Sequence, residues 1–134
     1  MRKKNSICEF RDQRSRLLLE NFRRSIARQS HISFLKAFKE AAEAPAPRFW
    51  VSEARATRII AMMLKGSDPL EGMRSAKRQM YLEIFRRVKE MMAECPGQPL
   101  GDIVFEVVNS EAPESYIDWQ WAQRLILKEK HKNI

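Results

Sequence analysis

The chain has 134 residues, 44% of them apolar and 31% charged, which suffices for one ordinary core or two small ones and is unlike a disordered chain. Lys and Arg number 25 against 17 Asp and Glu, and the resulting net charge of +8 favours an anionic partner. The two cysteines lack CxxC spacing, and no apolar run is long enough to span a bilayer. We therefore expect a cytoplasmic protein with no cofactor, no metal site and no membrane partner.

The first half of the chain predicts three helices behind a basic N-terminal arm of residues 1–10. Apolar residues recur at helical spacing from residue 11 and indicate the first helix. A second helix should begin after Ser33, a good N-cap residue, and end before the prolines of 45–47. A third should begin after Ser52, whose side chain can accept amide hydrogens of the first turn.

The second half repeats the first after a short linker, residues 66–73. Residues 74–88 match residues 11–25 at an offset of 63, and both stretches contain Leu-Glu-x-Phe-Arg-Arg. After a short insertion the offset becomes 66, which aligns Ser52 with Asp118, another N-cap residue type. The repeat indicates an internal duplication of one helical module.

One segment of the second copy allows two interpretations. Residues 102–109, DIVFEVVN, are rich in β-branched residues and could form a strand. The aligned FKEAA of the first copy is helical in pattern, so we expect a helix, with a strand as the alternative. The sequence thus predicts an all-α fold with two tandem three-helix modules, residues 11–65 and 74–131, and a tail of residues 132–134.

Such modules resemble tri-helical helix-turn-helix proteins of the homeodomain or Myb kind, which place their third helix in the DNA major groove. The connection before the third helix, about eight residues with two prolines, is longer than the usual turn of that motif. The stretch PRFWVSEARA is also similar to small basic bacterial proteins, and this likeness implies no function.

The third helix of the first module carries the candidate nucleic-acid surface. If Ala56, Ile59, Ile60 and Met63 form its buried stripe, Arg58 points outward, and the aligned residue is again arginine, Arg124. Arg58 could reach a phosphate or a guanine edge; alternatively it is solvated or pairs with a nearby carboxylate. The predicted nucleic-acid-binding residues are Arg14, Arg24, Arg48, Arg55, Thr57, Arg58, Lys65 and Arg124.

The second module differs from the first in charge. Its 9 basic and 9 acidic residues cancel, whereas residues 11–65 contain 12 basic and 5 acidic ones. Trp121 replaces Arg55 in the alignment, so a basic flank becomes aromatic, which favours a contact with a protein or with a second copy of the chain. Packing inside the fold is the alternative. The predicted partner-binding residues are Trp119, Trp121 and Leu127.

Catalytic chemistry has little support in the sequence. The two histidines are 100 residues apart, no Gly-rich phosphate loop occurs, and the carboxylates are scattered. We predict a non-enzymatic DNA-binding protein, of the kind found in bacterial regulation or mobile elements, with RNA as the less favoured target. The alternative is an all-helical adaptor that binds an acidic protein partner.

Overall fold

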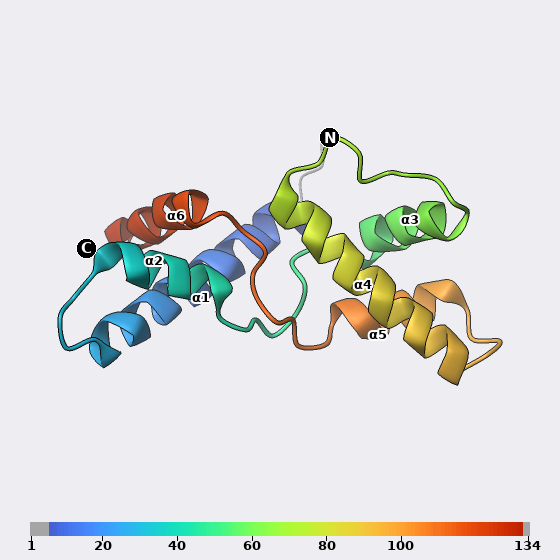
Figure 1. Ribbon diagram of the computed structural model, residues 1–134, viewed down its shortest axis with the longest axis horizontal. Coiled ribbons are helices and arrows are strands. Elements are labelled where there is room, and N and C mark those ends of the chain that lie inside the picture. Colours follow the sequence, from blue (N-terminus) through green and yellow to red (C-terminus); the bar gives the residue numbers. More distant parts are fainter. Residues whose placement is uncertain (1–5, 133–134) are drawn as a thin grey trace. The chain divides into compact units, whose positions relative to one another are not determined.

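The computed structural model describes residues 6–132. These residues form six helices joined by loops and contain no strand (Figure 1). The all-α prediction is confirmed, and residues 102–108 are helical, so the strand alternative is wrong. The first helix already begins at Ser6, inside the predicted arm, whose Arg2, Lys3 and Lys4 lie outside the described residues. The helices are α1 (Ser6–Arg28), α2 (Phe34–Glu43), α3 (Glu53–Leu64), α4 (Ser75–Glu94), α5 (Leu100–Val108) and α6 (Trp119–Lys132).

The predicted helix starts in the first half are confirmed by their caps. Ser33 Oγ accepts a hydrogen bond from the Lys36 amide at 3.2 Å, and Ser52 Oγ accepts one from the Arg55 amide at 3.1 Å. Each satisfies an amide that has no partner within the first turn of its helix. Gly66, with φ of 90°, follows Lys65, the C-cap residue of α3, and turns the chain away from the helix.

None of the helices formed by residues 6–132 combines the length and the apolar character that a bilayer span requires.

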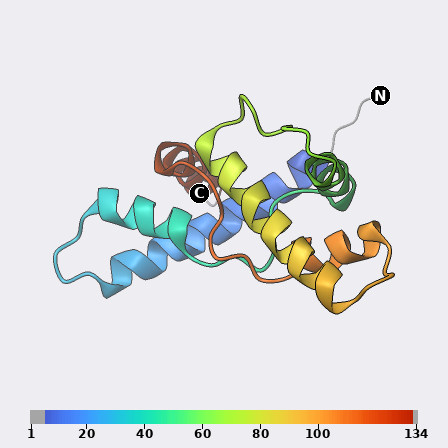
Figure 2. The ribbon, with the colours of Figure 1, turned by 45° about the vertical axis from the view of Figure 1, so that its right-hand side comes forward.

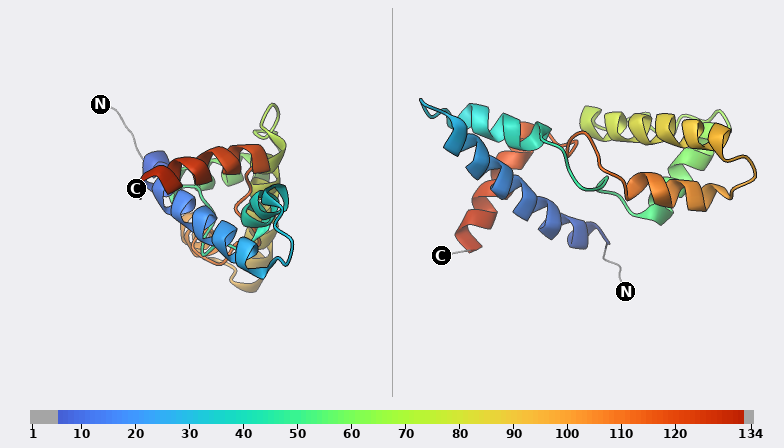
Figure 3. Two further views of the ribbon diagram at one scale, coloured as in Figure 1. Left: turned by 90° about the vertical axis from the view of Figure 1, so that its left-hand side faces the viewer. Right: turned by 90° about the horizontal axis from the view of Figure 1, so that it is seen from below.

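The helices group into two compact units that do not follow chain order. Unit 1 comprises Met1–Ala46 and Pro113–Ile134, and unit 2 is the continuous segment Pro47–Ala112. In unit 1, α6 packs against both α1 and α2, and in unit 2, α3 packs against both α4 and α5. In unit 1, α1 and α2 form an antiparallel pair, and in unit 2, α4 and α5 form another (Figure 2). Figure 3 shows the same groups from two further directions.

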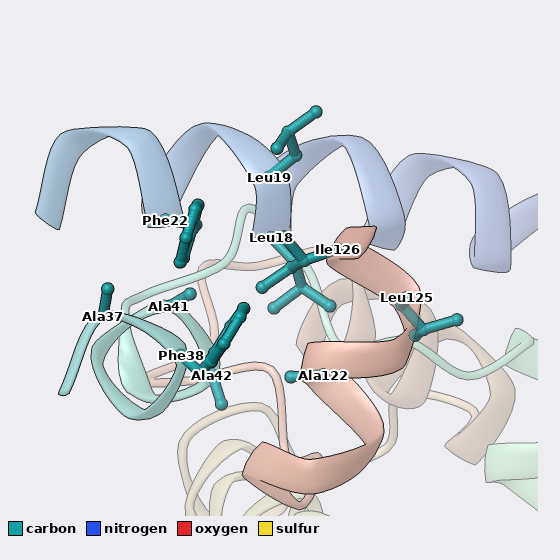
Figure 4. Packing of buried hydrophobic residues seen from close by; sticks show 10 residues of the cluster. All are labelled: Leu18, Leu19, Phe22, Ala37, Phe38, Ala41, Ala42, Ala122, Leu125 and Ile126. Atoms are coloured by element: carbon teal, nitrogen blue, oxygen red, sulfur yellow. The ribbon is translucent and has the colours of Figure 1, made fainter. Parts of the chain in front are cut away.

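Unit 1 is held by an apolar cluster to which all three of its helices contribute (Figure 4). The Phe22 and Phe38 rings stack with centroids 4.8 Å apart and join α1 to α2. Leu18 and Ile126, both fully buried, join α1 to α6. Because α6 supplies Ala122, Leu125 and Ile126 to this cluster, α1 and α2 depend on it to cover their apolar faces.

Unit 2 has a core of its own, to which α3, α4 and α5 all contribute buried residues. Three residues of the predicted α3 stripe, Ala56, Ile59 and Ile60, are buried, whereas the fourth, Met63, is only half-buried. The remaining buried residues of its helices are Met80, Tyr81, Ile84, Val88, Ile103, Val104, Val107 and Val108.

One backbone hydrogen bond occurs in both units at matching residues. The Phe49 amide donates to the Val108 carbonyl at 2.9 Å in unit 2, and the Ser115 amide donates to the Ala42 carbonyl at 3.2 Å in unit 1. At the offset of 66, Phe49 aligns with Ser115, and Ala42 aligns with Val108. The segment that precedes α3 is therefore bonded to the end of α5, and the segment that precedes α6 is bonded to α2.

The units thus differ from the modules predicted along the chain. The helix expected to complete the first module, α3, lies in unit 2, and the segment expected as an inter-module linker, residues 66–73, connects α3 to α4 within that unit. Helices α2 and α3 belong to different units, and an extended segment with Pro45 and Pro47 connects them. The prolines of 45–47 account for this, because they stop α2 and favour an extended path over a tight turn.

Candidate nucleic-acid interface

The predicted nucleic-acid-binding residues are divided between the two units. Arg14, Arg24 and Arg124 belong to unit 1, and the residues of α3 and its flanks belong to unit 2. The surface predicted on one module therefore becomes two separate sets of cations.

The net charge is also unequally divided. The segments of unit 1 contain 15 of the 25 Lys and Arg residues and eight of the 17 Asp and Glu residues, so unit 2 has ten and nine. Almost all the net positive charge is therefore in unit 1, whereas α3 belongs to a unit that is close to neutral. Any anion attracted to α3 must be held by a local group of cations and not by the charge of the whole unit.

Such a local group lies where α3 packs against α4. Tyr81 of α4 has a raised pKa because it is buried, and the nearby charges of Arg55 and Arg58 act in the opposite direction. Both arginines of α3 are therefore near enough to Tyr81 for their charges to act on it. Lys77 and Arg78 lie one turn before Tyr81 on α4. We call Arg55, Arg58, Lys77 and Arg78 the α3–α4 basic group.

The members of this group are exposed and free of carboxylates. None of the four forms an ion pair among residues 6–132, and the guanidinium of Arg78 donates only to the Met73 carbonyl, at 3.3 Å. Glu53, one of the acids that could have neutralised Arg58, instead accepts a hydrogen bond from Asn109 at 3.0 Å. The group can therefore donate to phosphate oxygens without first breaking an ion pair.

The other predicted residues of unit 2 are already engaged. Arg48 donates from Nε to the Phe49 carbonyl at 2.9 Å and from Nη2 to the Val51 carbonyl at 2.7 Å. Thr57 Oγ1 donates to the Glu53 carbonyl at 2.7 Å, within its own helix. Arg48 and Thr57 thus have structural hydrogen bonds, while Lys65 is exposed at the C-terminal end of α3.

Arg24 of unit 1 is also paired, and its partner explains the repeated sequence motif. Its Nη2 lies 2.9 Å from Glu20 Oε2, and in the second copy Arg87 Nε lies 2.7 Å from Glu83 Oε2. The Glu and the second Arg of Leu-Glu-x-Phe-Arg-Arg are therefore an i, i+4 ion pair in both helices. Intrahelical pairing accounts for this part of the motif without any ligand.

Arg14 is the least solvated of the predicted cations. Burial lowers the pKa of its guanidinium, and the charge of Arg11 lowers it further. Its buried Nε has no hydrogen-bond partner among the described residues.

The aromatic residues of α6 have different environments. Trp119 is partly buried against the unit 1 cluster, and Lys39 Nζ lies 5.8 Å from its ring centroid. Trp121 and Leu127 are about two-fifths exposed, and the Arg124 guanidinium lies 5.4 Å from the Trp121 ring centroid. Trp121 and Leu127 are therefore available at the surface, whereas Trp119 is mainly a packing residue.

The alignment relates the cations of the two units. Arg124 of unit 1 corresponds to Arg58 of unit 2, and Arg14 corresponds to Lys77. Lys77 and Arg78 were not predicted from the sequence, although the alignment of Lys77 with Arg14 is a signal that could have found the former. Nothing in the sequence shows that α4 and α3 share a surface, since that depends on the tertiary grouping.

Residues 6–132 contain no group of three or more His, Cys, Asp or Glu side chains arranged to hold a metal ion. Neither a protein-family model, nor a curated protein, nor a solved structure matches this chain.

Proposed function

We propose that this protein binds nucleic acid, with DNA favoured over RNA, and that its principal contact is the α3–α4 basic group. The observation that supports this is the set of four cations on two packed helices, exposed and without an acidic partner among the described residues. Arginine and lysine in such a group can each neutralise a phosphate and release the counterion bound to it. The net charge of unit 1 would add attraction at longer range.

We also propose that the chain is a duplicated helical protein in which the two copies have exchanged their third helices. The matching backbone hydrogen bonds of Phe49 and Ser115 and the matching ion pairs of Arg24 and Arg87 support this origin. A duplication would supply two related basic surfaces, one near Arg58 and one near Arg124. Regulation or mobile-element function in bacteria is consistent with this proposal.

The proposal is tested by fluorescence anisotropy with labelled duplex DNA, single-stranded DNA and RNA at increasing salt. We expect binding in the micromolar range at low salt, with log K falling linearly with log salt. Arg55→Gln combined with Arg58→Gln should weaken binding to every sequence and reduce the magnitude of the salt slope by about two. The control is Arg86→Gln, because Arg86 is paired with Glu83 and Glu90, at 2.7 Å in each case.

Two results would contradict the proposal. One is the absence of binding to any of the three probes at low salt. The other is an equal loss of affinity in the control variant, which would mean that the α3–α4 basic group has no special role.

A further inference from the structure

The connection between α1 and α2 lies at one end of this antiparallel pair in unit 1 (Figure 2). This connection and the start of α2 carry three large apolar side chains that are exposed. Ile32, Phe34 and Leu35 are 58%, 61% and 48% exposed. Large apolar side chains grouped in this way mark contact sites more often than isolated ones do. The corresponding connection of unit 2, residues 95–99, has the sequence CPGQP and exposes no large apolar residue. The feature is therefore specific to unit 1.

The backbone that presents these side chains is fixed by hydrogen bonds. The Ser33 amide donates to Gln29 Oε1 at 2.7 Å, and Ser33 Oγ in turn caps α2. The Phe34 ring stacks on Phe22, with centroids 6.2 Å apart. A ligand would meet an ordered surface, so little conformational entropy would be lost on binding.

A polar pocket of about 480 Å³ adjoins the apolar side chains, lined in part by Arg28, His31, Lys36 and Glu40. Glu40 accepts from Arg28 Nη2 at 3.3 Å, and its other oxygen lies 4.0 Å from Lys36 Nζ. One carboxylate thus faces two cations, and both cations remain more than half exposed. The pocket therefore keeps a positive charge that its own residues do not neutralise.

We propose that this α1–α2 tip, defined as Ile32, Phe34 and Leu35 with the pocket cations Arg28 and Lys36, binds an acidic segment of a protein partner. The carboxylates of that segment enter the pocket, and apolar side chains between them cover the tip. This docking site is separate from the proposed nucleic-acid contact, since it uses no residue of the α3–α4 basic group.

Charge and shape favour this occupant over two others. A second copy of the chain, docked by two-fold symmetry, would bring Arg28 and Lys36 against the same charges of its partner. A bilayer surface could receive the apolar side chains, but a flat surface leaves a pocket of this size unfilled. A peptide with acidic and apolar side chains can pair with the cations, fill the pocket and cover the apolar residues.

The experiment measures binding of the full chain to a fluorescein-labelled peptide of alternating Glu-Leu and Glu-Phe pairs. Phe34→Ser with Leu35→Ser should lower the affinity at least tenfold, and Arg28→Gln with Lys36→Gln should lower it similarly and flatten its salt dependence. Phe105→Ser is the matched control, because Phe105 of α5 is 53% exposed but lies in unit 2. It should leave the affinity unchanged, and far-UV circular dichroism verifies that each variant is folded.

Several outcomes would overturn the docking site. These are no binding at the highest peptide concentration, equal binding of a peptide with Lys in place of Glu, or an equal loss in Phe105→Ser. If the chain binds phosphatidylglycerol vesicles but not the peptide, and the tip variants abolish vesicle binding, the tip is a membrane contact. A dimer in analytical ultracentrifugation that Phe34→Ser dissociates would assign it to a second copy. Arg55→Gln with Arg58→Gln should leave peptide binding unchanged, so this test and that of the nucleic-acid proposal fail independently.

Discussion

Arg48 and Asn109 are hydrogen-bonded from Nη1 to Oδ1 at 3.2 Å although 61 residues separate them in the sequence. Asn109 follows α5, and Arg48 lies in the segment that leads into α3. In the alignment at an offset of 66, Arg48 corresponds to Glu114, and Asn109 corresponds to Glu43. The same position is thus occupied by a hydrogen-bonded pair in unit 2 and by two carboxylates in unit 1.

Arg48→Met should destabilise the protein by about 1–3 kcal/mol, because it removes the guanidinium donor to the Val51 carbonyl and one of the two donors to the Phe49 carbonyl, which also accepts from the Val51 amide. Urea denaturation followed by circular dichroism measures the change. Arg58→Met, an exposed arginine without an ion pair, should change stability by less than about 0.5 kcal/mol. An equal loss in both variants would show that the Arg48 hydrogen bonds are not the cause.

Glu114→Gln should stabilise the protein at neutral pH. Burial raises the pKa of Glu114, and the charge of Glu43 raises it further. An acid whose pKa is higher in the folded than in the unfolded state destabilises the fold above that pKa, and the penalty disappears below the unfolded value. Urea denaturation at several pH values should therefore show that the stabilisation vanishes as the pH falls below the usual pKa range of glutamate.

Glu111→Gln is the control for that measurement, since Glu111 is an exposed carboxylate close by. It should leave the unfolding free energy unchanged at neutral pH. A stabilisation by Glu114→Gln that persisted at acid pH would exclude charge as its origin.

The grouping of helices can be tested by hydrogen exchange. Ile60 and Ile126 are both fully buried, in α3 and α6 respectively, and truncation of either to alanine should cost about 2–5 kcal/mol. We expect Ile126→Ala to accelerate amide exchange in α1 and α2, and Ile60→Ala to accelerate it in α4 and α5. Modules that followed chain order would give the opposite pattern.

The two serine caps should contribute about 1 kcal/mol each. Ser33→Ala and Ser52→Ala remove the side-chain acceptors for the Lys36 and Arg55 amides. Thermal denaturation should show a lower midpoint for both, whereas Ser30→Ala, exposed and outside any helix, should match the parent protein. No change at Ser52 would mean that water replaces the cap there without cost.

Local structure was largely predictable from the sequence, because its determinants are local. Ser33 and Ser52 cap helices as expected, and the comparison of residues 102–109 with FKEAA correctly favoured a helix. Which helices pack together was not predictable in this way. The apolar faces of α3 and α6 are similar in spacing, so the sequence does not show which helix pair each of them covers.

The candidate site was predictable only in part. Arg55 and Arg58 face outward on α3, as the spacing of its apolar residues requires. The hydrogen bonds of Arg48 to two carbonyls could not be foreseen, since they depend on the path of the connection into α3. Lys77 and Arg78 join Arg55 and Arg58 only because α3 and α4 share a unit.

Unit 1 is formed from two separate segments of the chain, and this affects the order in which the units can fold during synthesis. Helices α1 and α2 leave the ribosome well before α6, and contacts such as that of Asp12 with Lys132, at 3.7 Å, close a very long loop. Unit 2 is one unbroken segment and can complete its core first. The α1–α2 pair is therefore synthesised before the helix that covers its apolar face, and that face stays exposed until α6 has been made.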